Sequence, residues 1–234
     1  MRVNTLLAAV FAGWAALGCM QADSNPTRRT TIPGGLQQQP TDREYAVYAA
    51  LLKTLYVDIT QTALTGDGNR IGGIGPVVTQ IVLADQTLDI RVIPTGEGDE
   101  VDKGICGAEL ISIAQTLKGC NHNLAEAFAE ANRHPASLQQ QHISVESLKI
   151  ILIQQRSYAW PMQPEYTKPY VYSRYPRCQG VSLLSRVGFS QDGNRAVVYL
   201  QTCRAMLYGR GWVFLLERSG ETWNVREGEL KWMS

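Results

Sequence analysis

Residues 182–202, SLLSRVGFSQDGNRAVVYLQT, decide the fold of this chain. Two apolar runs, 182–189 and 195–202, flank a short polar segment that contains Asp192-Gly193. Asp-Gly between two apolar runs of strand length is a strong signal for a tight antiparallel hairpin. Centring the turn on this pair places Cys203 opposite Ser182, and we expect the hairpin to begin a C-terminal sheet.

The sequence after this hairpin continues as a meander of short strands. Three further segments of strand length, separated by Gly-containing stretches, lie at 212–217, 222–226 and 230–233. Successive side chains of a strand point to opposite faces, so Trp223, with Val225, is expected to be buried between polar neighbours. By the same alternation, Leu230 and Trp232 are expected on the buried face of the strand and Lys231 on the solvent-exposed face. The C-terminal block is therefore predicted as an antiparallel β-meander of about five strands.

A helix and a hairpin are predicted at the start of the folded region. Thr41 and Glu44 form a capping-box pattern, and apolar residues at helical spacing follow, so we expect a helix over 42–56. Two β-rich stretches, 77–83 and 87–93, flank a short polar tripeptide and predict a hairpin.

Two more helices are predicted in the middle of the chain, over 108–117 and 124–132. Gly119 is a natural C-terminal residue for the first, and Asn121 or Asn123 is a good N-cap for the second. An apolar run of strand length at 147–153 and a short helix after Pro169 complete the elements. The predicted fold class is α+β, with an N-terminal helix and hairpin, middle helices and the C-terminal meander.

The N-terminus has the pattern of an export signal. Arg2 precedes the uncharged run 6–17, LLAAVFAGWAAL, which ends at Gly18-Cys19. A positive residue, a short apolar stretch and a small residue at the cleavage point are typical of signal peptides. The run is shorter than the ~20 residues that a membrane-spanning helix needs. Residues 1–18 are thus predicted to be a signal peptide, with an uncleaved anchor as the less favoured alternative.

Residues 19–40 are predicted to be a flexible tether. The stretch is rich in Pro, Gly, Thr and Gln and has almost no large apolar side chains, so it cannot bury enough surface to fold alone. The predicted organisation is a signal peptide at 1–18, a tether at 19–40 and a single α+β domain at 41–234.

Gly18-Cys19 resembles the lipobox of bacterial lipoproteins, although Ala16 and Leu17 are not the residues usual before it. The resemblance implies that Cys19 becomes a diacylated N-terminus, which would hold the protein to a membrane of the cell envelope. Met20 after the cysteine favours the outer membrane over the inner one. An ordinary secretory signal, cleaved after Gly18 to release a periplasmic protein, is the alternative.

Four cysteines lie beyond Cys19, at Cys106, Cys120, Cys178 and Cys203. An even number in an exported chain predicts two disulfides, while sequence alone allows three pairings and reduced thiols are the alternative. The expected hairpin brings Cys178 near Cys203, so this pair is favoured, with Cys106–Cys120 as the second. A full helix between Cys106 and Cys120 spans ~15 Å, and a disulfide allows ~7 Å between Cα atoms, so a crossed pattern stays open.

The C-terminal block also resembles uncharacterised secreted proteins and lipoproteins of bacteria that carry a C-terminal antiparallel β-meander. The residues that carry this resemblance include Leu184-Ser185-Arg186-Val187-Gly188-Phe189-Ser190, Ala196-Val197-Val198-Tyr199 and Trp232-Met233-Ser234. Such relatives often have a second cysteine near the position of Leu207, so Cys203 needs another partner here. The resemblance implies an exported α+β protein and brings no established activity.

Nucleic acid, cofactors and metals are not expected as partners. Lys and Arg number 22 against 21 Asp and Glu, and no basic cluster stands out, whereas phosphate backbones require clustered positive charge. No Walker A, G-x-S-x-G, H-E-x-x-H or C-x-x-C motif is present in the sequence.

Few residues offer catalytic chemistry. Ser185 with Arg186 is the one pair to consider for a hydrolase, but Ser185 shares its strand face with apolar neighbours, which predicts a buried hydroxyl bonded to backbone. The histidines lie in polar helix-end or loop contexts and are expected to be exposed, at positions His122, His134 and His142.

An aromatic-rich stretch could form a binding patch from Trp160, Tyr166, Tyr170 and Tyr172. Aromatic side chains are enriched at protein interfaces, and packing into the core is the alternative.

Two classes of function therefore stay open. The favoured one is a non-catalytic binding or structural lipoprotein of the cell envelope, with an envelope protein or a cell-wall component as its partner. The alternative is a periplasmic hydrolase with a non-standard site around Ser185 or His134.

Overall fold

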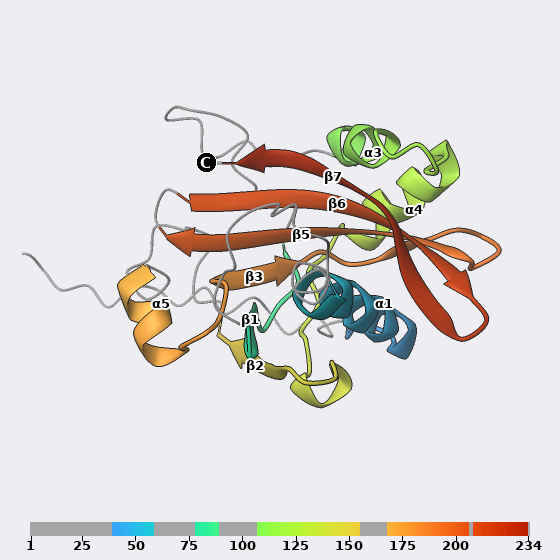
Figure 1. Cartoon of the computed structure of the whole chain (residues 1–234). Coiled ribbons are helices and arrows are strands. Elements are labelled where there is room, and N and C mark those ends of the chain that lie inside the picture. The colour runs from blue at the N-terminus through green and yellow to red at the C-terminus, as the bar shows by residue number, and fades with distance from the viewer. Residues whose placement is uncertain (1–38, 59–77, 89–106, 155–167, 206–207, 234) are drawn as a thin grey trace, which may run out of the picture. The chain divides into compact units, whose positions relative to one another are not determined.

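The computed structural model describes residues 39–58, 78–88, 107–154, 168–205 and 208–233, which belong to one compact unit, Leu36–Ser234. These residues form helices and a mixed sheet with the strand order β2-β1-β3-β5-β6-β7, and β4 pairs with β5 beside this path (Figure 1). The predicted α+β class is confirmed, with antiparallel strands at the C-terminal end.

The elements follow in chain order. They are α1 (Asp42–Lys53), a π-helical turn (Thr54–Asp58), β1 (Gln80–Ala84), α3 (Gly107–Gln115), α4 (His122–Ala131), a 3-10 turn (Gln140–His142), β2 (Lys149–Ile153), α5 (Lys168–Arg174), β3 (Val181–Leu184), β4 (Gly188–Phe189), β5 (Arg195–Ala205), β6 (Tyr208–Ser219) and β7 (Thr222–Met233).

The helix α1 begins at the predicted capping box. Glu44 N donates to Thr41 Oγ1 at 3.3 Å, and Thr41 N donates to Glu44 Oε2 at 2.8 Å, so two amides at the helix start are satisfied. The α-helical part ends at Lys53, earlier than the predicted boundary, and continues as the π-helical turn.

The middle helices also lie close to their predicted positions. The Asn121 side chain caps α4 by accepting a hydrogen bond from Leu124 N at 2.9 Å. The apolar run at 147–153 forms β2, and Pro169 lies in the first turn of α5, where its missing amide hydrogen is tolerated.

The predicted hairpin over 77–83 and 87–93 is wrong. Val82 of β1 lies beside Ile151 of β2 on one side and Val181 of β3 on the other, and both pairings are parallel. Both edges of β1 are therefore occupied by strands from far along the chain. Nearly all residues of β1 are buried, as is typical of parallel strands covered on both faces. Such a strand shows no alternation of apolar and polar residues, so its sequence does not reveal its pairing. Residues 89–93 lie outside the described part of the chain.

The first C-terminal hairpin forms as predicted around Asp192-Gly193, but its first strand is interrupted. From Leu184 to Gly188 the chain advances four positions, whereas their partners on β5, Leu200 and Val197, are three apart. The segment 185–187 therefore accommodates one extra residue between β3 and β4. This shift places Cys203 opposite Val181 and not opposite Ser182 as predicted.

The last strand, β7, is one continuous strand where two were predicted. Trp223 is 5% exposed, as predicted, but Leu230 is 39% exposed and the Lys231 side chain only 14% exposed. The predicted burial of Leu230 and the predicted exposure of Lys231 are therefore wrong. The register between β6 and β7 shifts between Val225 and Glu227, so the alternation that starts at Trp223 does not carry through to Leu230. The side chain of Trp232 is not described.

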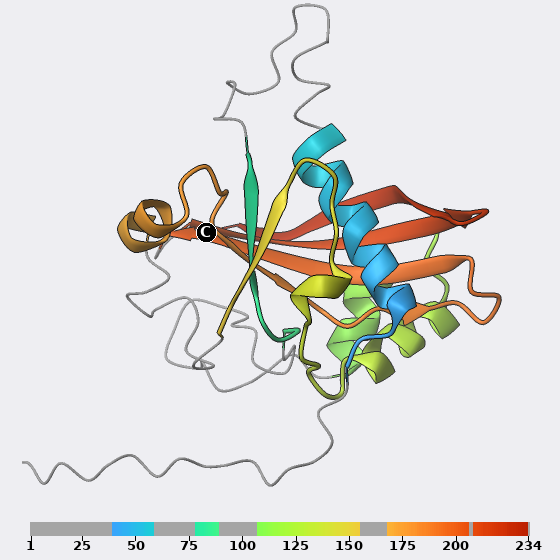
Figure 2. The same ribbon diagram turned by 90° about the horizontal axis from the view of Figure 1, so that it is seen from below.

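Each face of the sheet carries its own apolar cluster. Adjacent residues of one strand contribute to different clusters, as Leu183 and Leu184 do in β3 and Leu215 and Leu216 in β6. Helix α1 packs into one cluster, and α3, α4 and α5 contribute to the other; the helices can be followed in Figure 2. The segment between β3 and β4 thus runs between two helical layers.

Replacing Trp223 by Ala is expected to lower the free energy of unfolding by ~3–5 kcal/mol, because a large buried aromatic side chain is lost. The Trp223 ring lies 5.8 Å from that of Phe189, and the guanidinium of Arg43 lies over both rings. Urea unfolding measures the change. Leu230→Ala on the same strand is the control and should cost below ~1 kcal/mol; an equally small effect of Trp223→Ala would contradict the face assignment.

Candidate functional site

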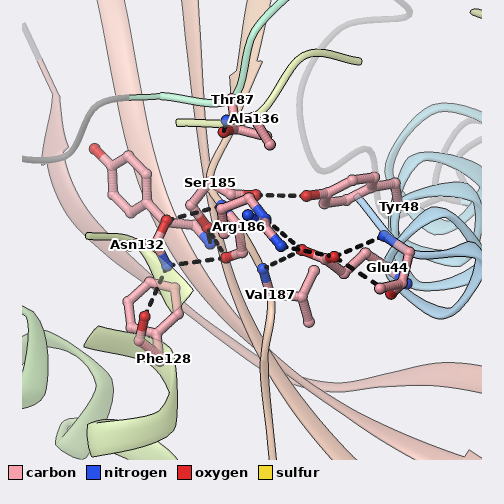
Figure 3. A network of polar contacts seen from close by, with 11 residues as sticks. Glu44, Tyr48, Thr87, Phe128, Asn132, Ala136, Ser185, Arg186 and Val187 are labelled. Carbon is pink, nitrogen blue, oxygen red and sulfur yellow. Dashed lines mark hydrogen bonds and ion pairs between the residues drawn. The ribbon is translucent and has the colours of Figure 1, made fainter. Parts of the chain in front are cut away.

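A buried polar network centres on Arg186, between β3 and β4 (Figure 3). Arg186 Nε donates to Glu44 Oε1 at 2.7 Å and Arg186 Nη2 donates to Glu44 Oε2 at 3.1 Å. The two side chains are 11% and 3% exposed. This is a bidentate ion pair between the first turn of α1 and the segment that joins β3 to β4.

The carboxylate of Glu44 has further donors. It accepts hydrogen bonds from Val187 N at 3.3 Å and, through the capping box, from Thr41 N. Burial acts to lower the pKa of Arg186, but the hydrogen bonds and negative charge of Glu44 outweigh it and raise that pKa above its usual value. The guanidinium is therefore held in its charged form by a partner that is itself well hydrogen-bonded.

Asn132, the C-cap residue of α4, holds the backbone of Arg186 from the opposite face. Its Oδ1 accepts from Arg186 N at 2.8 Å, and its Nδ2 donates to Arg186 O at 3.0 Å and to Phe128 O at 2.8 Å. The Asn132 side chain thus binds the backbone of Arg186 as a neighbouring strand would. Only 2% of Asn132 is exposed.

Ser185 is buried and bonded to backbone, as predicted. Its Oγ donates to Arg186 O at 2.7 Å and accepts from Tyr199 N at 2.8 Å, and its carbonyl accepts from Tyr48 OH at 2.9 Å. Burial above all raises the pKa of Tyr48 well above its usual value, so the phenol stays a donor. A nucleophilic serine gives its proton to a base, whereas Ser185 gives its proton to a carbonyl, so this geometry does not favour nucleophilic catalysis.

The histidines are exposed, as predicted. His122 lies 3.2 Å from Glu126 on α4, and His142 stacks on Tyr45 with 5.0 Å between ring centroids. His134 is likewise exposed. Across the described ranges no three or more His, Cys, Asp or Glu side chains gather as metal ligands do.

The cysteines that the structure describes are buried. Cys178 and Cys203 belong to the same apolar cluster as Cys120, and the described residues contain no disulfide. Burial raises the pKa of Cys120 to about 11 and also raises that of Cys178, which keeps both as thiols. Cys19 and Cys106 lie outside the described residues, so lipidation and the Cys106–Cys120 bond stay predictions. Cys178 and Cys203 are both described and are not joined to each other in the structure, so their disulfide is a prediction for the oxidised protein.

Non-reducing peptide mapping of the full-length protein, purified under oxidising conditions, is expected to recover a Cys178–Cys203 disulfide. The register supports proximity, since Cys203 lies opposite Val181 and Cys178 lies three positions before that residue. Helix α3 lies between Cys106 and Cys120, so the second pair requires its flanking segments to double back. A bond from Cys120 to Cys178 or Cys203 would refute the predicted pairing, and recovery of free thiols only would refute disulfide formation.

Most side chains of the predicted aromatic patch lie outside what the structure describes, so the patch stays a prediction. Trp160 and Tyr166 lie outside them, and the side chain of Tyr170 on α5 is not described. Tyr172 is half-buried against the apolar cluster that contains Cys178, so it packs against the core.

Sequence reasoning singled out Ser185 and Arg186 but missed Glu44 and Asn132, which bind Arg186. Glu44 and Arg186 are 142 positions apart, and no local pattern pairs them. One signal was available: Arg186 interrupts an apolar strand, and an arginine in such a place is rarely buried without an acidic partner.

The described helices include none that is both long and apolar enough to cross a membrane. Comparisons of the chain with family models, with curated proteins and with solved structures find no match.

Proposed function

We propose that this chain is an exported lipoprotein of the cell envelope, anchored through Cys19, whose α+β domain is a non-catalytic binding or structural module. One observation carries the proposal: a short apolar run ends at Gly18-Cys19 and is followed by the polar stretch 19–40. Two acyl chains on one cysteine give stable membrane attachment, where a single chain is marginal. The polar stretch would then space the domain from the membrane surface.

The geometry of the polar groups supports the non-catalytic part of the proposal. Ser185, Arg186 and Asn132 bind one another and the backbone, which is the arrangement of a structural network. The alternative, a hydrolase built around Ser185 or His134, gains no support from these contacts. Binding therefore has to be sought at the surface of the domain, with an envelope protein or a cell-wall component as the partner.

Replacing Cys19 by Ser is expected to move the protein from the membrane fraction to the soluble fraction, because the acyl chains have no attachment point. Fractionation after labelling with a fatty-acid analogue measures both location and lipid. Gln21→Ser, two residues further on, is the control and should leave lipid and location unchanged. A wild-type protein that is soluble and unlabelled would show that the lipobox interpretation is wrong.

The binding role is tested by crosslinking the full-length chain in its native envelope and identifying the adducts. We expect a specific envelope protein or cell-wall fragment. The competing result is hydrolysis of ester, amide or glycoside substrates by the purified protein that disappears in His134→Ala. His134 is exposed, so its replacement should not unfold the domain, and such a loss would favour the hydrolase.

A further inference from the structure

We propose that Arg186 couples the docking of α1 on one face of the sheet to the docking of α4 on the other. Its guanidinium binds Glu44 of α1, and its backbone binds Asn132 at the end of α4 (Figure 3). The inference rests on the contacts of the fold and does not depend on lipid anchoring.

The segment that carries Arg186 is held by side chains from both layers. Residues 185–187 lie between β3 and β4 and outside both strands. The N–H and C=O of Arg186 are bonded to Asn132, and the N–H of Val187 is bonded to Glu44. The position of this segment therefore depends on α1 and α4 together.

The charge of Arg186 makes the dependence on α1 strong. The guanidinium is 11% exposed, and its charge is balanced by the Glu44 carboxylate. If Glu44 loses its charge while α1 stays packed on the sheet, a buried cation remains without its counter-charge, which is costly. The segment then gains by moving so that Arg186 reaches water.

Movement of this segment directly disrupts its contacts with α4. It breaks both bonds between Arg186 and the Asn132 side chain and leaves a buried amide unsatisfied. Gly188, two residues further on, lies so close to Phe128 that a Cβ there would overlap the helix backbone. Displacement of the segment is therefore transmitted to α4 between Phe128 and Asn132.

Hydrogen exchange of the full chain tests the coupling, with Glu44→Gln as the variant. This change removes the charge and keeps the size of the side chain. We expect amide exchange to rise at least ~tenfold at the start of α1 and also at Asn132 and Arg133, whose amides close the last turn of α4. Asp42→Asn, in the same helical turn but with a 97% exposed side chain, is the matched control and should change neither region.

Binding free energies linked through one residue act in both directions. Asn132→Ala is therefore expected to raise exchange in α1 as well as in α4. An increase confined to the helix that carries each substitution would overturn the proposal.

If Glu44→Gln lowers the stability of the whole domain, a double-mutant cycle still distinguishes coupling from a general loss of stability. Unfolding equilibrium constants are measured for Glu44→Gln, Asn132→Ala and the double variant. We expect their effects to deviate from multiplicativity by ~tenfold, since both substitutions release the same segment. Independent effects, within the error of the measurement, would overturn the coupling even if each variant is much less stable.

Discussion

Gly188→Ala is expected to reduce the free energy of unfolding by at least ~3 kcal/mol, at the upper end of what overpacking costs. A Cβ at position 188 would lie 2.6 Å from Phe128 Cβ and closer still to the backbone N and Cα of Phe128. Backbone atoms of a helix cannot rotate away as a flexible side chain can. The substitution therefore forces α4 and β4 apart and opens the apolar cluster between them.

Urea unfolding followed by fluorescence measures this effect. Gly220→Ala is the control, because nothing lies within 4 Å of its added Cβ and only its positive φ of 61° is unfavourable. That backbone conformation costs an L-residue ~1–2 kcal/mol. If Gly188→Ala is no more destabilising than Gly220→Ala, the close approach of α4 to β4 is wrong.

Arg186→Met is expected to destabilise the protein by ~3–5 kcal/mol, the range found when one partner of a buried ion pair is removed. Methionine fills much of the same space, but it leaves the carboxylate of Glu44, itself 3% exposed, without its cation. Adding Glu44→Gln to Arg186→Met removes the uncompensated charge and should restore part of the loss.

Arg133→Met supplies the matched control for this ion pair. Arg133 Nε lies 2.7 Å from Glu130 Oε2, the same separation as between Arg186 and Glu44, but its side chain is 70% exposed. Exposed pairs contribute ~0–1 kcal/mol, so Arg133→Met should change stability little. Equal effects of the two substitutions in denaturant unfolding would show that Arg186 does not depend on its buried partner.

Local sequence signals predicted the parts of the fold that depend on neighbours in the chain. Asp192-Gly193 set the hairpin because few residue pairs suit its turn. Thr41 and Asn121 set the starts of α1 and α4 because their side chains satisfy amides within the next turn. Alternation likewise predicted the burial of Trp223.

The same signals gave only part of the candidate site. Alternation predicted that Ser185 is buried and bonded to backbone, and the structure confirms this. The partners of Arg186 were not predictable, because Glu44 and Asn132 reach it from segments distant in sequence and from opposite faces of the sheet. Contacts of this kind exist only once three elements have packed.

The sequence by itself determined the hairpin turn, the helix starts and the burial of Trp223, since each depends on residues a few positions apart. Tertiary structure alone decided that β1 pairs in parallel with β2 and β3, that Leu230 is exposed, and that Glu44 binds Arg186. Strand partners are selected by burial on both faces of the sheet, and a buried charge is tolerated only beside its counter-charge. Both conditions concern the assembled layers, which no local stretch of the sequence contains.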